Sequence, residues 1–307
     1  MHDPDTAQGP DRQRQAWLFA ALTVALWSTV ATAFELGLRV LGPAQLLAGA
    51  NVVAVITLFA ITAARGGLGG ALFITRGEHL RALALGLLNP FLYYLVLFEA
   101  YARLPGQVAQ PLNYTWVITL SLLAVPFLGQ RLGRGEIAAM LVAWCGVLVI
   151  ATNGELSGLG VDDPLGIVLA LASTLVWSAY WLLAARDRRE PVGALLLNFS
   201  YALPFTLLAA ALLPGRFDHG ALALGAMVWV GMAEMAMSFV LWLLAMQRAR
   251  STAAIASLIF VSPFLSLLLL AFVAGESIRS ATPIGLLLIV AGIALQQRLR
   301  PSPSPDS

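Results

Sequence analysis

The feature that most constrains the fold of this chain is a series of ten apolar runs, separated by short breaks that carry charge, glycine or proline. A helix needs about 20 apolar residues to cross the hydrocarbon core of a bilayer. Charged residues make up only 11% of the chain, against about 25% in soluble domains. We therefore expect an all-α integral membrane protein with ten transmembrane helices and no soluble catalytic domain. The predicted helices cover residues 16–38, 44–64, 80–102, 106–128, 136–152, 164–185, 191–213, 221–247, 252–274 and 282–297.

The first run also has the features of a cleaved secretory signal, because residues 17 to 30 precede the small residues Ala31-Thr32-Ala33. This run contains Trp27-Ser28, however, and the same dipeptide returns as Trp177-Ser178 in the middle of the sixth run. The recurrence predicts that the first run is retained and that the chain contains two related halves.

Further matches extend this internal repeat at an offset of 146 positions. The residues Phe127-Leu128-Gly129-Gln130 align with Val273-Ala274-Gly275-Glu276, and Gly146 aligns with Gly292. The natural division is into residues 1–153 and 154–307, each with five predicted helices. Because five is odd, the second half must enter the membrane inverted relative to the first. An inverted repeat is typical of secondary transporters, which bind substrate near the bilayer midplane between the halves.

The distribution of arginine predicts the orientation in the membrane. Of 18 basic residues, all arginine, 14 fall on one side of the predicted helices and four on the other, namely Arg39, Arg103, Arg216 and Arg279. The positive-inside rule then places both termini in the cytoplasm. A sequence pI near 9.0 could also indicate nucleic-acid binding. The arginines occur singly or in twos and threes between apolar runs, so we expect a lipid bilayer and no nucleic acid as partner.

The sequence offers no recognisable catalytic or metal-binding motif. His2, His79 and His219 all fall in tails or connectors, and the single cysteine, Cys145, has no partner for a disulfide. Phosphate-binding glycine motifs and nucleophile elbows do not occur in a suitable context. We expect no enzyme activity, no metal and no cofactor. The sequence leaves the oligomeric state open, and a monomer is compatible with it.

Glu234 is the acidic residue predicted to lie nearest the middle of the membrane, about 20 Å into the eighth helix. An ionisable group at the bilayer centre costs about 2.5 to 3.5 kcal/mol on insertion scales and usually has a function. Glu234 could bind a proton or a substrate ammonium group, or it could pair with another polar side chain in packing. The repeat places it opposite Leu88, beside Asn89-Pro90. Because proline can kink a helix, the third helix is expected to be interrupted there.

Aromatic and amide side chains in the fourth helix predict a cavity wall. Asn113 and Trp116 share a helix face at a spacing of three, and Tyr114 lies beside them. Such a group suits an organic solute with an apolar side chain or a cation, although core packing would use the same residues. Trp27 and Trp177 are expected to form symmetry-related walls of the same cavity. The full set of candidate substrate-binding residues is Trp27, Ser28, Asn89, Tyr93, Tyr94, Asn113, Tyr114, Trp116, Trp177, Tyr180, Glu234 and Ser238.

Other residues have expected structural roles. Glu35 with Arg39 and Glu99 with Arg103 have the spacing of helical ion pairs at the membrane rim. Gly146 and Gly292 are expected to be points of close helix packing. Several polar residues could equally hydrogen-bond between helices, and they are Tyr93, Tyr94, Asn51, Asn198, Tyr201 and Ser238.

Five motifs give the chain its resemblance to a known family, over essentially all of residues 17 to 297. They are Ala25-Leu26-Trp27-Ser28-Thr29, Gln110-Pro111-Leu112-Asn113-Tyr114-Thr115-Trp116, Phe127-Leu128-Gly129-Gln130, Ser262-Pro263-Phe264 and Gly275-Glu276. With them the chain resembles the drug/metabolite transporter superfamily, EamA type, and most closely the YddG-type amino acid exporters.

This resemblance implies a multi-pass protein of the bacterial cytoplasmic (inner) membrane that exports small amphipathic metabolites by alternating access. Amino acids, including aromatic ones, are the expected substrates. The resemblance also implies that helices one to four and six to nine enclose the cavity, with five and ten at the periphery. Export of drugs, quaternary ammonium compounds or sugar conjugates remains an alternative, and a non-transporting membrane scaffold is a third.

Overall fold

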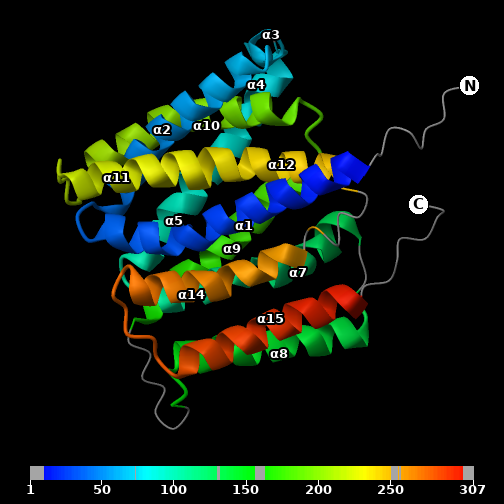
Figure 1. The fold of residues 1–307 in the computed structure, drawn as a ribbon, viewed down its shortest axis with the longest axis vertical. Helices are drawn as coiled ribbons and strands as arrows, with labels where there is room; N and C mark the ends of the chain where they lie inside the picture. Colours follow the sequence, from blue (N-terminus) through cyan, green and yellow to red (C-terminus); the bar gives the residue numbers. More distant parts are fainter. Residues whose placement is uncertain are drawn as a thin grey trace, which may run out of the picture.

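The computed structural model describes residues 10–72, 74–129, 132–155, 163–249, 255 and 257–299. Across these residues the chain is helical, and the long helices run roughly parallel to one another (Figure 1). The predicted all-α fold is confirmed. The elements are α1 (Pro10–Leu38), α2 (Pro43–Ala64), α3 (Leu68–Leu72), α4 (Arg76–Gly86), η2 (Leu87–Leu92), α5 (Tyr93–Tyr101), α6 (Gly106–Tyr114), α7 (Trp116–Leu128), α8 (Arg134–Ala151), α9 (Pro164–Ala184), α10 (Pro191–Leu212), α11 (Ala221–Trp229), η3 (Val230–Ser238), α12 (Phe239–Arg248), η4 (Ser257–Val261), α14 (Ser262–Phe272) and α15 (Ala281–Leu299).

Within the described ranges, nine helical stretches are long and apolar enough to cross a membrane. The predicted ninth helix, residues 252–274, corresponds to the shorter apolar stretch Leu258–Phe272, and part of its start lies outside the described residues. The count of ten spans therefore stays a prediction. The start of α1 and the end of α15 lie on the same face of the molecule (Figure 1). Their assignment to the cytoplasm also stays a prediction.

The third, fourth and eighth predicted helices are interrupted along their length. The third is divided into α4 and α5 by the π-helical segment η2, where Asn89 leaves helical geometry (φ −143°, ψ 118°) just before Pro90. The kink predicted there is confirmed. The fourth breaks at Thr115, between α6 and α7, one turn after Pro111. The eighth contains the π-helical segment η3, which carries Glu234. π-Helical segments occur frequently at functional sites.

Glycines allow the third helix of each half to approach the second helix of the other half. A Cβ atom added to Gly86 would lie 2.2 Å from the carbonyl oxygen of Asn198 in α10. One added to Gly231 in η3 would lie 2.2 Å from the carbonyl oxygen of Ala50 in α2. These contacts are possible only without side chains, as at other close helix crossings in membranes. In both halves of the chain, the third helix therefore packs closely against the second helix of the other half.

Helices α8 and α15 pack side by side at the edge of the molecule (Figure 1). The backbone at Gly146 approaches Gly285, and the backbone at Gly292 approaches Ala139, so that a Cβ at any of the three glycines would lie within 3 Å of a neighbouring carbonyl oxygen. The close packing predicted at Gly146 and Gly292 is confirmed. The fifth and last predicted helices thus pair with each other, outside the helices that surround the centre.

Polar contacts at the rim agree only in part with the sequence. Arg39 pairs with Glu35 at 3.5 Å, as predicted. Arg103 pairs instead with Asp163 at 3.6 Å, so the expected pair with Glu99 is wrong. Asp163 also accepts a hydrogen bond from the backbone N–H of Gly166 and caps α9. Helical spacing predicts only partners on the same helix, whereas folding brings this connector carboxylate to Arg103.

Candidate functional site

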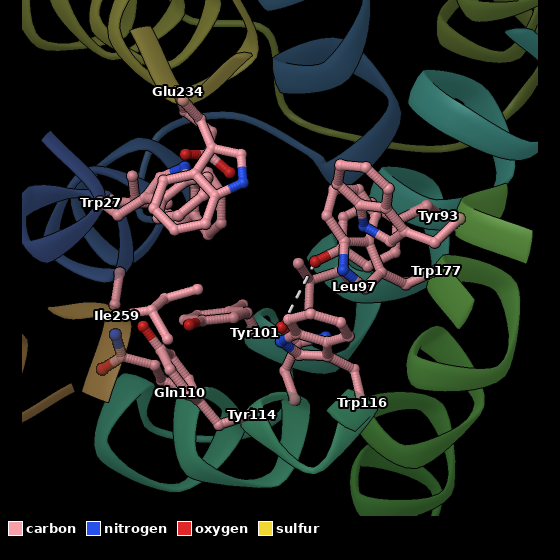
Figure 2. Close-up of a pocket in the computed structure, with 16 residues that line it drawn as sticks. Trp27, Tyr93, Leu97, Tyr101, Gln110, Tyr114, Trp116, Trp177, Glu234 and Ile259 are labelled. Carbon is pink, nitrogen blue, oxygen red and sulfur yellow. Dashed lines mark hydrogen bonds between the residues drawn. The ribbon is translucent and has the colours of Figure 1, made fainter. Parts of the chain in front are cut away.

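A cavity lies in the middle of the helix bundle and receives side chains from both halves of the chain (Figure 2). It encloses about 120 Å³ of space open to water. This volume is several times the minimum of about 10 to 15 Å³ that a cavity needs to hold one water molecule. The lining residues are Trp27, Val30, Ala31, Phe34, Tyr93, Leu97, Tyr101, Gln110, Asn113, Tyr114, Trp116, Trp177, Trp181, Glu234, Trp242 and Ile259.

Two groups of aromatic rings face each other across the cavity. On one side Trp27 lies beside Trp242, with ring centroids 5.3 Å apart. On the other, Trp177 stacks on Tyr93 with centroids 4.4 Å apart and meets Trp116 edge-on at 6.4 Å. Figure 2 shows Trp27 and Tyr93 at opposite sides of the opening. These walls can bind an apolar ring by stacking or a cation by its attraction to ring faces.

Glu234 is the charged residue of the lining and sits beside Trp27 (Figure 2). Tyr94, which lies outside the lining, fixes the position of this side chain: its hydroxyl donates a hydrogen bond to Oε1 of Glu234 at 3.0 Å. The residue is only 9% exposed, and Oε2 is buried with no hydrogen-bond partner among the described residues. Since buried polar groups normally have partners, Oε2 is an acceptor available to a bound solute.

Two neighbouring polar residues of the lining are engaged with the protein itself. Asn113 donates to the hydroxyl of Ser173 at 2.9 Å and accepts from the hydroxyl of Tyr93 at 3.3 Å. Tyr114 donates to the hydroxyl of Ser262 at 2.9 Å. These bonds hold α6 against α9 and α14 and orient the aromatic wall.

Two further lining residues have polar atoms without a partner in the described part of the chain. They are Oε1 of Gln110 and the indole nitrogen of Trp181, both buried. With Oε2 of Glu234, the buried lining atoms that lack a partner are two acceptors, on Glu234 and Gln110, and one donor, on Trp181.

The structure brings seven of the twelve candidate residues into this lining: Trp27, Tyr93, Asn113, Tyr114, Trp116, Trp177 and Glu234. The other five do not line it, although Tyr94 lies directly behind Glu234. The hydroxyls of Ser28 and Ser238 donate to carbonyl oxygens of their own helices, those of Val24 and Glu234. Asn89 is fully buried within η2, and Tyr180 lines a neighbouring hollow.

Several lining residues are absent from the sequence-based set. Trp181 lies four residues after Trp177, and Gln110 lies three before Asn113. Both spacings place a residue on the face of one already chosen, so these two could have been found. Trp242, Phe34 and Tyr101 carry no such signal, because an isolated aromatic residue in an apolar helix can equally face lipid or core.

Hollows on both sides adjoin the cavity. One contains Asp187 and Arg189 near the end of α9, and shares Trp181 and Trp242 with the cavity. The other contains Glu276 and Arg279 near the start of α6, and shares Tyr101 with it. Aromatic side chains therefore separate the cavity from a charged hollow toward either face of the molecule.

Comparison with protein families finds one match that covers most of the chain. The model described as the EamA-like transporter family matches residues 15–152 and again residues 164–296. The second match repeats the first in the other half of the chain.

Individual relatives are similar over almost their whole length. An aromatic amino acid exporter, YddG, of Ancylobacter novellus is 26% identical over 91% of this chain and 96% of its own. An uncharacterised transporter of Archaeoglobus fulgidus is 23% identical over the same shares. A solved crystal structure at 24% identity covers 94% of this chain and 100% of its own with a TM-score of 0.65, and supports the fold.

Proposed function

Because the chain belongs to the EamA-like transporter family, we propose that it exports small amphipathic metabolites by alternating access. The protein is a multi-pass transporter of the inner membrane. Amino acids, including aromatic ones, are the proposed substrates. The observation that carries this proposal is the central aromatic cavity with Glu234 in its wall. The name of the Ancylobacter novellus relative, an aromatic amino acid exporter, supports the same choice.

The cavity would open to the two faces in turn. Tyr101 stands toward one adjoining hollow, and Trp181 and Trp242 toward the other. Movement of these aromatic residues would connect the cavity to one side at a time. The breaks at η2, Thr115 and η3 provide points where helix ends can tilt, since interrupted helices are the usual moving parts near transporter sites.

The proposed moving units are the two halves, residues 1–153 and 154–307, arranged as inverted five-helix repeats. The corresponding contacts of Gly86 with α10 and Gly231 with α2 support this division. The α8–α15 pair would support the fold at the edge without lining the route, because neither helix contributes a residue to the cavity lining.

The experiment that tests the proposal is exchange of labelled amino acids in proteoliposomes, measured with and without a pH gradient. We expect counterflow of phenylalanine, tryptophan and their relatives above that of protein-free vesicles. Absence of exchange for every amino acid tested, with folded protein present, would refute the proposal. A dependence on the pH gradient that persists in Glu234→Gln would show that Glu234 does not carry the proton.

Aromatic substitutions test the site separately. Trp116→Ala and Trp177→Ala should reduce exchange because they remove one wall of the cavity. Trp144→Ala is the matched control, since Trp144 lies on α8, is 37% exposed and does not line the cavity. Trp177→Phe, which keeps much of the buried volume, provides a folded variant if the alanine variant is unstable. Normal exchange in all of the cavity variants would contradict the proposed site.

A further inference from the structure

Charge and hydrogen bonding in the cavity point to a narrower substrate class, an inference that rests on the proposed function. We infer that the cavity recognises an ammonium group and provides no positive charge to pair with a carboxylate. Amphipathic amines with an aryl or alkyl group would therefore bind more tightly than the amino acids that share their side chains.

The unpartnered atoms of the lining match an ammonium group. It carries three N–H donors, and Oε2 of Glu234 is a buried acceptor without a partner among the described residues. The ring of Trp27 lies beside Glu234 (Figure 2), with Trp242 next to it. Ring faces attract cations, and more strongly where water is excluded. Tyr94 holds the carboxylate in place by its hydrogen bond to Oε1.

No positive charge is available in the lining to receive a carboxylate. Glu234 is the charged residue among the described lining residues, and the rest are apolar, aromatic or neutral amides. In an adjoining hollow, Arg189 binds Asp187 at 2.6 Å and Asn198 at 2.9 Å; its Nη1 has no partner among the described residues, but Arg189 does not line the cavity. A buried charge without a partner is unfavourable. For a zwitterion, the free-energy cost of burying the carboxylate therefore offsets the binding free energy gained from the ammonium group.

Repulsion adds to this loss. When the ammonium group of an amino acid contacts Glu234, its own carboxylate lies about 5 Å from that of Glu234. Two like charges at this separation, with an effective dielectric constant of about 20, weaken binding by roughly a hundredfold. Indole N–H groups such as that of Trp181 can offset part of this penalty. We therefore expect a preference for the amine of at least about tenfold.

The aromatic wall opposite Glu234 is suited to the remainder of the solute. Trp177 stacks with Tyr93 and is met edge-on by Trp116, which leaves ring surfaces directed into the opening (Figure 2). An arylalkylamine can place its cation at Glu234 and its ring against this wall. One negative charge and two aromatic walls thus match a molecule with one positive end and one apolar end.

The test measures binding of four matched compounds to the purified full-length protein by isothermal titration calorimetry. They are 2-phenylethylamine, a cation; phenylalanine, a zwitterion; phenylalaninamide, which keeps the substituted carbon but lacks the negative charge; and 3-phenylpropionate, an anion. We expect the two cations to bind at least tenfold more tightly than phenylalanine, and the anion to show no binding. Phenylalaninamide separates the effect of charge from that of size.

Substitution identifies the residue responsible. Glu234→Gln should reduce the preference for the amine over phenylalanine to less than about threefold. Glu99→Gln is the matched control, because it makes the same chemical change on α5 outside the lining and should leave the preference intact. If Glu234→Gln does not fold, the four-compound series on the unmodified protein still decides the inference.

The inference and the proposed function can fail separately. If phenylalanine binds as tightly as 2-phenylethylamine, or if the preference survives in Glu234→Gln, the inference is wrong. If labelled phenylalanine is exchanged by proteoliposomes and 2-phenylethylamine does not compete, the inference falls and the proposed function stands. If none of the compounds binds or is exchanged, both are wrong.

Discussion

Gly231 offers a direct test of how the cavity carboxylate is positioned. A Cβ atom at this residue would lie 2.2 Å from the carbonyl oxygen of Ala50 and 2.7 Å from the Cβ of Val53. Contacts of Cβ atoms under 3.0 Å are essentially never found, so Gly231→Ala must move η3 away from α2 by about 0.8 Å. Such overpacking costs about 1 to 3 kcal/mol. We expect Tm to fall by about 5 °C, since 1 kcal/mol corresponds to about 2 to 4 °C in a large domain.

The same displacement should affect binding, because Glu234 lies three residues along the same segment. A hydrogen bond to a charged group contributes about 1.5 to 3 kcal/mol, so its loss weakens amine binding at least about tenfold. Gly225→Ala in α11 is the matched control, since a Cβ there meets nothing within 4 Å. Thermal unfolding and calorimetric titration of both variants check the expectation. Equal Tm and affinity in the two variants would show that the contact with Ala50 does not position Glu234.

Three further substitutions test other parts of the structure. Trp177→Phe should weaken the binding of aromatic solutes by about 1 kcal/mol, because an aromatic contact contributes about this much. Trp144→Phe is the control and should leave the affinity unchanged. Titration of both variants with 2-phenylethylamine measures the two affinities. The carboxylate of Glu276 accepts hydrogen bonds from the backbone N–H groups of Gly106 and Gln107, at 2.8 and 3.2 Å, at the start of α6. Glu276→Gln removes this negative charge from the helix N-terminus and should destabilise the protein by about 1 kcal/mol. Thermal unfolding measures the change, and an unchanged Tm would contradict the expectation. In the connector after α9, partial burial raises the pKa of Asp187, but hydrogen bonds and charge from Arg189 outweigh it and hold that pKa below its ordinary value. The resulting stability is present above about pH 3.9, the value for an unfolded Asp, and is lost as pH falls through the lower folded value. The Tm advantage over Asp187→Asn should therefore shrink below about pH 4, and a constant difference across pH 3 to 7 would contradict the assignment.

Local sequence patterns predicted those parts of the site that depend on one helix at a time. The break at Asn89-Pro90 follows from the geometry of proline, and the shared face of Asn113 and Trp116 follows from helical periodicity. Ser28 belongs to the repeated Trp-Ser pair and Ser238 is a polar residue of the predicted eighth helix, yet their hydroxyls bond to carbonyls one turn back. This local bond is always open to serine in a helix, so burial alone does not direct a serine toward a cavity.

Contacts between helices from different halves could not be predicted in this way. Tyr94 meets Glu234 across 140 positions of sequence. Arg103 finds Asp163 in a connector from the other half, rather than Glu99 on its own helix. Trp242 packs beside the ring of Trp27 from the other half of the chain. In each case the partner depends on how far two helices are rotated about their axes, which periodicity within either helix does not specify.

The sequence by itself determined that the chain is a helical membrane protein, because bilayer thickness and the backbone's need for hydrogen bonds leave apolar runs of this length one stable form. It also predicted the interruption of the third helix at Asn89-Pro90. Only the tertiary structure decided which side chains meet at the centre, how Glu234 retains one free oxygen, and that no basic residue among the described lining residues accompanies it. The physical reason is that a cavity is a property of several helices packed together, and its chemistry depends on their relative rotation and depth.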